Sequence, residues 1–127
     1  MEREILFRAK HIHAIPELKH FGGRWVYGYL SNENHINSPE LEGEFLIDPK
    51  TVCQYTGLTD KNGRKIFEGD IVRYANIGAL GKVVWYEGDY IGYAIDDIED
   101  SFQQYEKELF EKTEVIGNIF DNPELLR

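Results

Sequence analysis

Hydrophobic and polar residues alternate over several short stretches of this chain, as they do in strands that bury one face. The first stretch is residues 2–9, where Arg3, Ile5, Phe7 and Ala9 occupy every second position. In an extended chain these four side chains point to the same side. The pattern predicts a half-buried strand.

A second strand is predicted in residues 24–30, directly after a Gly-Gly pair. Trp25, Tyr27 and Tyr29 lie two residues apart, so a strand places them on one face of a sheet. An exposed edge of this strand could pair with a second copy of the chain, which predicts a homo-oligomer. Residues 31–43 are rich in Asn, Ser, Pro and Gly, and we expect a surface loop there.

Further short runs of β-branched and aromatic residues are separated by turn-forming residues. We predict strands at residues 44–47, 51–56, 65–67, 71–74, 82–86, 90–95 and 113–120. Asn62-Gly63 accepts the positive φ angles of a type I′ turn, which predicts a hairpin tip at residues 60–63. The close spacing of the strands within residues 71–95 is typical of a meander in a small barrel.

One segment has helical rather than strand periodicity. Within residues 97–110, the apolar positions are spaced four, three and four apart, at Ile98, Phe102, Tyr105 and Leu109. We predict a short amphipathic helix there, and a second helix start at residues 121–124. The expected fold is mainly β, a single domain of residues 1–127. About 1–50 would form N-terminal strands and loops, and about 51–127 a barrel portion.

The net charge of −9 restricts the classes of partner. Binding to phosphate backbones needs cations, so direct nucleic-acid binding is not expected. Much of the acidity lies in residues 87–111, which hold nine acidic residues and a single basic one, Lys107.

Cys53 is the only cysteine, so no internal disulfide can form, which fits a reducing compartment. The longest stretch without Lys, Arg, Asp or Glu is residues 51–59, far shorter than a membrane span. The first residues are charged and do not resemble a signal peptide. We therefore expect a cytoplasmic protein with no membrane partner.

Three segments resemble the YopX family of small proteins encoded by bacteriophages and prophages. They are residues 54–63 (QYTGLTDKNG), residues 66–72 (IFEGDIV) and residues 114–126, which contain EVIGNIF and NPELL. The resemblance implies a β-rich fold with an SH3-like barrel in the C-terminal portion, and an origin in a phage or prophage. It implies no established activity, cofactor or catalytic residue, so no functional residue carries over.

The candidates for chemistry each have a structural alternative. Cys53 could act as a nucleophile beside a histidine and an acid, but within a strand a small cysteine more often packs in the core. His11 and His13 would point to the same side of an extended segment, yet zinc needs three or four ligands and no further pair completes a site. We therefore expect no catalytic residue, metal or cofactor.

Two neighbouring segments are candidates for partner binding. The aromatic residues that bracket one predicted hairpin could bind a peptide; they are Trp85, Tyr86, Tyr90 and Tyr93. The acidic residues that follow could be the solvated side of a helix, or a negative surface that attracts a basic partner; they include Asp96, Asp97, Glu99 and Asp100.

These observations favour a non-enzymatic phage or prophage accessory protein, a module for protein binding or assembly. The alternative is an acidic inhibitor that imitates DNA and binds a host nucleic-acid-binding protein.

Overall fold

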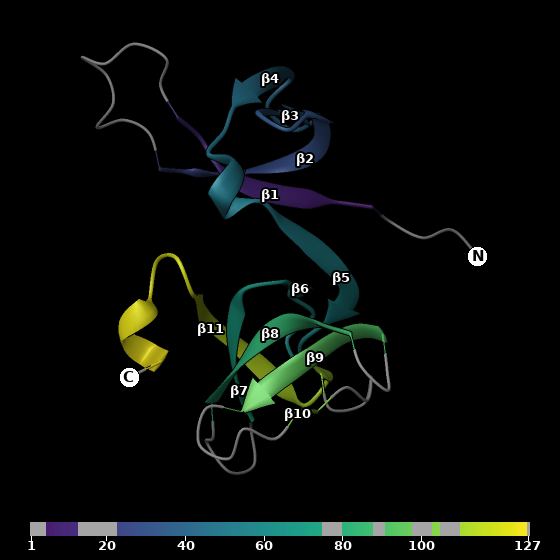
Figure 1. The fold of residues 1–127 in the computed structure, drawn as a ribbon. Coiled ribbons are helices and arrows are strands. Elements are labelled where there is room, and N and C mark those ends of the chain that lie inside the picture. Colours follow the sequence, from purple (N-terminus) through teal and green to yellow (C-terminus); the bar gives the residue numbers. More distant parts are fainter. Residues whose placement is uncertain are drawn as a thin grey trace. The chain divides into compact units, whose positions relative to one another are not determined.

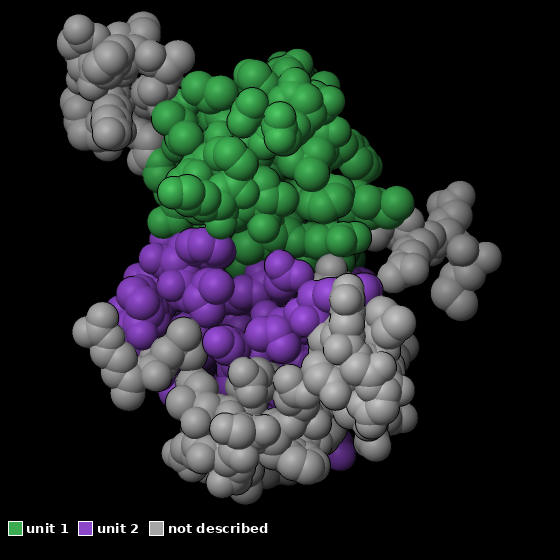
Figure 2. All heavy atoms as spheres, in the orientation of Figure 1, with its two compact units in different colours: residues 1–55 green, residues 56–127 purple. Residues whose placement is uncertain are grey.

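In the computed structural model, the described residues are 5–12, 23–74, 80–87, 91–97, 103–104 and 110–126. They form two compact units, Met1–Tyr55 and Thr56–Arg127 (Figures 1 and 2). The described part is mainly β, with two antiparallel sheets and no α-helix; its helical elements are 3-10 turns. No helix within it is long and apolar enough to cross a membrane.

Unit 1 contains four strands that follow one another in the sheet in the order β4-β3-β2-β1. Their bounds are Phe7–Lys10 (β1), Trp25–Asn32 (β2), His35–Ser38 (β3) and Gly43–Leu46 (β4). A bridge between His11 and Ile47 links the segment after β1 to the segment after β4. Alternate residues of these strands therefore face a common core, formed by Ala9, Val26, Ile36 and Ile47.

A 3-10 turn, η2 (Pro49–Thr51), leads from unit 1 into β5 (Cys53–Thr59). The Asp48 side chain accepts a hydrogen bond from the Lys50 amide and caps this turn. The buried hydroxyl of Thr51 accepts from the Lys10 amide at 2.8 Å. These bonds fix where β5 begins, and β5 then pairs with β1 through Cys53 and Gln54.

Unit 2 begins within β5 and continues through a hairpin into a meander. Its further elements are β6 (Lys65–Phe67), β7 (Asp70–Tyr74), β8 (Leu80–Glu87), β9 (Ile91–Asp97), β10 (Gln103–Gln104), β11 (Thr113–Asn118) and η3 (Pro123–Leu126). The second sheet has the order β10-β9-β8-β7-β11. The core of unit 2 contains the buried side chains Ile66, Val72, Val83, Ile95, Phe110 and Val115.

The hairpin at residues 60–63 is confirmed, but its turn type is not the one expected. The Gly63 amide donates to the Asp60 carbonyl and the Asp60 amide to the Arg64 carbonyl. Gly63 has a φ of +80°, whereas Asn62 is not among the residues with positive φ. A type I′ turn would need positive φ at both. Of the two residues, only Gly63 has a positive φ, as in three-residue hairpin loops that end in a glycine bulge.

Four other sequence predictions are corrected. The described strands of unit 2 form no closed barrel, so the SH3-like barrel is not found as such. A continuous helix over 97–110 is wrong, because Asp97 ends β9 and Gln103–Gln104 pair with β9. Of the other residues in that segment, only Phe110 is described. The loop expected at 31–43 contains β3, and the helix start at 121–124 leads only to the 3-10 turn η3.

Candidate binding surfaces

The predicted face of Trp25, Tyr27 and Tyr29 exists and is partly open to solvent. Tyr27 is 37% exposed and Tyr29 is 54% exposed. On the other face of the same strand, Val26 is 3% exposed and belongs to the core of unit 1. The strand therefore separates the core from an outward aromatic row, which we call the β2 face and define as Tyr27 and Tyr29 with Asn37.

β2 is an internal strand of its sheet, not an edge. Trp25 to Gly28 pair with β1, and residues 29–32 pair with β3. The premise that an exposed edge around Arg24–Leu30 pairs with a second copy is therefore wrong. Asn37 lies directly across from Tyr29 in this register, and it too is exposed.

Trp25, at the start of β2, is stacked against two cations. The guanidinium carbon of Arg8 lies 4.7 Å from the centroid of the indole ring, and the Lys10 ammonium lies 5.5 Å from it. Such contacts hold both the cation and the ring in place. Arg8 is only 4% exposed. Its charge is thus used inside unit 1 rather than presented to a ligand.

The predicted hairpin of Trp85, Tyr86, Tyr90 and Tyr93 is formed by β8 and β9. Trp85 is paired in register with Tyr93, and Tyr86 with Gly92. Trp85 is 47% exposed, although Val83, on the same face two residues earlier, is buried in the core. Tyr90 lies outside the described residues.

Of the acidic candidates, two occupy the end of β9. Asp96 is paired in register with Lys82, and Asp97 with Gly81. Glu99 and Asp100 lie outside the described residues.

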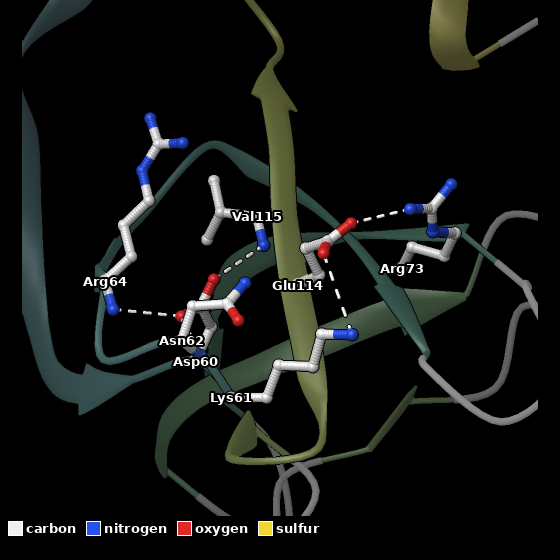
Figure 3. A network of polar contacts seen from close by, with 7 residues as sticks. All are labelled: Asp60, Lys61, Asn62, Arg64, Arg73, Glu114 and Val115. Atoms are coloured by element: carbon white, nitrogen blue, oxygen red, sulfur yellow. Dashed lines mark hydrogen bonds and ion pairs between the residues drawn. The ribbon is translucent and has the colours of Figure 1, made fainter.

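The hairpin motif at residues 60–63 serves the fold of unit 2. Asp60 is 4% exposed, and one carboxylate oxygen accepts the amides of Asn62 and Arg64, each at 2.9 Å. The other oxygen accepts the Val115 amide of β11, also at 2.9 Å (Figure 3). The Lys61 amide donates to the Thr113 carbonyl. The hairpin thus caps backbone groups of β11 that β7 does not bind.

An ion-pair cluster lies beside this cap. The Arg73 guanidinium donates to Glu114 at 2.6 Å, and the Lys61 ammonium is 3.7 Å from the same carboxylate (Figure 3). The hydrogen bond from Arg73 is the main cause that holds the pKa of Glu114 below its ordinary value of 4.5. Desolvation opposes this shift, while Lys61 and a hydrogen bond from Asn62 add to it.

The other motif segments of the YopX resemblance are also built into the structure. The Asp70 carboxylate accepts the Phe67 amide at 2.8 Å and is 1% exposed. The Asn118 side chain accepts the amides of Phe120 and Asp121, and the Asn122 side chain accepts the Asn118 amide. These polar residues satisfy backbone groups at turns, so each of them has a structural role in the fold.

Cys53 and the histidines occupy structural positions where they are described. Cys53 is 2% exposed, and its thiol donates to the Thr51 carbonyl at 3.3 Å. His11 Nδ1 lies 3.0 Å from the Leu46 carbonyl oxygen, and its ring stands edge-on against Phe45. His13 lies outside the described residues. The part of the chain that the structure describes holds no group of three His, Cys, Asp or Glu side chains suited to a metal.

Sequence reasoning did not select the β2 face as a candidate site. The alternation of Trp25, Tyr27 and Tyr29 indicated that these residues share a face of the strand. The same pattern is equally typical of a face that is buried in the core. Only the burial of Val26 and Ile36 on the other side shows that the tyrosines face outward.

The family model described as YopX protein matches residues 19–127. No curated protein matches the chain significantly. Among solved structures, the crystal structure of protein EF1440 from Enterococcus faecalis is similar, with a TM-score of 0.54 and 22% sequence identity. The match covers 99% of this chain and 100% of that one. At this identity the likeness speaks for the fold alone.

Proposed function

Since this chain belongs to the YopX family, we propose that it is a non-enzymatic accessory protein of a bacteriophage or prophage that acts by binding another protein. The binding surface in this proposal is the β2 face of unit 1. The observation that carries the proposal is the exposure of Tyr27 and Tyr29 on a strand whose other face contributes the buried Val26 to the core of unit 1.

The chemistry of the β2 face suits a protein partner. Tyrosine rings offer a large contact area at a small cost in side-chain entropy, and they are enriched in protein interfaces. The amide of Asn37 across from Tyr29 adds donors and acceptors at the edge of the aromatic area. The nearby cations of Arg8 and Lys10 stack on Trp25, which disfavours a phosphate backbone as the ligand.

The proposal is tested with the tagged full chain, used to capture proteins from a lysate of the bacterial host with and without nuclease. Three chains are compared by mass spectrometry: wild type, the double variant Tyr27→Ser/Tyr29→Ser, and the control Leu41→Ser. Leu41 is 59% exposed but lies in the β3–β4 loop, so it controls for loss of surface hydrophobicity. We expect wild type and control to retain the same protein after nuclease, and the double variant to lose it.

The affinity for that protein should fall by at least about tenfold in the double variant, because aromatic anchors dominate such interfaces. Retention by all three chains would show that the β2 face is not used. If the protein were lost instead when Asp96, Asp97, Glu99 and Asp100 are replaced by Lys, the acidic DNA-mimic alternative would replace this proposal. Recovery of this chain alone would indicate the homo-oligomer, which stays a prediction.

A further inference from the structure

The tip of the β5–β6 hairpin places an asparagine directly before a glycine on an exposed turn. Asn62 and Gly63 are both exposed, and no atom outside the neighbouring residues lies within 4 Å of the position where a Gly63 Cβ would be. We infer that Asn62 is a deamidation site and that the hydrogen bonds of the Asp60 turn control its reactivity.

The reaction needs only water. The backbone nitrogen of Gly63 attacks the side-chain carbonyl carbon of Asn62 and gives up its proton, while the bond to the side-chain nitrogen breaks and ammonia leaves. Water then opens the resulting succinimide ring at either carbonyl, which yields aspartate or isoaspartate. Glycine as the next residue favours the attack because it has no side chain to obstruct the ring.

The folded turn restrains the attacking nitrogen. The Gly63 amide donates to the Asp60 carbonyl at 3.0 Å, and the Asn62 amide donates to the Asp60 carboxylate at 2.9 Å. Ring closure requires the Gly63 nitrogen to leave its acceptor and the peptide unit between the two residues to rotate. The reaction therefore proceeds from states in which this turn has opened, and its rate reports that opening.

Deamidation would also change the contacts of the turn. The Asn62 side-chain amide is one of the groups that hold the pKa of Glu114 low, and the Glu114 carboxylate also binds Arg73 and Lys61. A carboxylate at position 62 replaces that donor with a like charge. The isoaspartate product also lengthens the backbone between Asp60 and Arg64. The Asp60 carboxylate then cannot keep its bonds to Arg64 and Val115 together. The modification thus loosens the cap on β11.

The inference is tested on the full chain incubated at mildly alkaline pH. Peptide mapping by mass spectrometry follows the mass increase at residue 62 and separates aspartate from isoaspartate. The same chain unfolded in concentrated urea gives the unrestrained rate. We expect the native chain to react at Asn62 at least about tenfold more slowly, since local opening costs free energy.

Two further arms keep the inference falsifiable. Asp60→Asn should bring the native rate toward the unfolded rate. Because this variant also lowers global stability, wild type is followed at urea concentrations below its unfolding transition, where the rate should rise with urea. Equal rates in native and unfolded chains, or a native rate unaffected by both urea and Asp60→Asn, would overturn the control by the turn. A chain whose Asn62 stays intact even when unfolded would overturn the site itself.

Discussion

The carboxylate of Asp60 accepts the backbone amide of Val115 at 2.9 Å, across 55 residues of sequence. β11 is an edge strand of its sheet, with β7 on one side. Free amides on an edge strand invite pairing with other chains. In unit 2, the β5–β6 hairpin covers part of that edge. The buried carboxylate of Asp60 makes the hydrogen bond that joins the hairpin to β11.

Asp60→Asn should destabilise the protein by about 2–4 kcal/mol, because one acceptor oxygen is replaced by an amide donor that opposes an amide N–H of the turn or of β11. The measurement is the free energy of unfolding in urea. The neighbouring substitution Lys61→Ala serves as the control, since its exposed ion pair with Glu114 should contribute less than about 1 kcal/mol. Equal losses in both variants would contradict the role of Asp60.

Glu114 should make stability depend on pH. Its pKa is lowered in the folded protein, chiefly by the hydrogen bond from Arg73. A lowered folded pKa adds stability above the unfolded value, and that stability is lost as the pH falls from about the ordinary 4.5 through the folded pKa. In Glu114→Gln this contribution to stability should be absent. The free energies of unfolding of the variant and the wild type should therefore become equal at acidic pH.

This comparison is made from urea unfolding curves at several pH values, in low and in high salt. The exposed Glu124→Gln is the matched control. Salt should reduce the difference between Glu114→Gln and wild type, because the cluster is partly open to solvent. A difference that stays constant down to strongly acidic pH would exclude the ionised carboxylate as its source.

Gly28→Ala should be strongly destabilising although its φ angle is ordinary. A Cβ at this position would lie directly against the backbone carbonyl oxygen of Asn37, which belongs to the paired strand β3 and cannot move away freely. We expect a loss of about 2 kcal/mol or more in the free energy of unfolding. Gly43→Ala is the control, since its Cβ would meet Phe45 at an ordinary 3.5 Å. A similar cost for both would refute the steric explanation.

Local sequence patterns predicted most of the strands but not the contacts that bring them together. The alternation around Trp25 and the Asn62-Gly63 turn depend on neighbours in the chain, and both lie where they were expected. β3 was missed because three of the residues at 35–38 are polar, and only the burial of Ile36 reveals the strand. Its formation depends on pairing with β2 and β4, which no local pattern encodes.

The arrangement of the candidate binding residues could also not be predicted in full, because it too depends on how distant strands pair. The β8–β9 hairpin was predicted, whereas the pairing of Trp85 with Tyr93 is known only from its register in the structure. The periodicity at 97–110 predicted a helix, whereas Gln103 and Gln104 pair with β9, so tertiary pairing overrides the local preference. The exposure of Tyr27 and Tyr29 depends on which face of β2 the core of unit 1 covers.

The two faces of β2 should respond differently to truncation. Tyr29→Ser removes a ring that is 54% exposed, so the free energy of unfolding should change by no more than about 0.5–1 kcal/mol. Val26→Ala removes two buried methyl groups from a residue that is 3% exposed, and should cost about 1–3 kcal/mol. Urea unfolding of both variants measures this contrast. The reverse order would place the tyrosines in the core and remove the basis for a binding surface on this strand. The expected order would show that the Tyr29 ring contributes little to stability, as expected of a ring that is open to a partner.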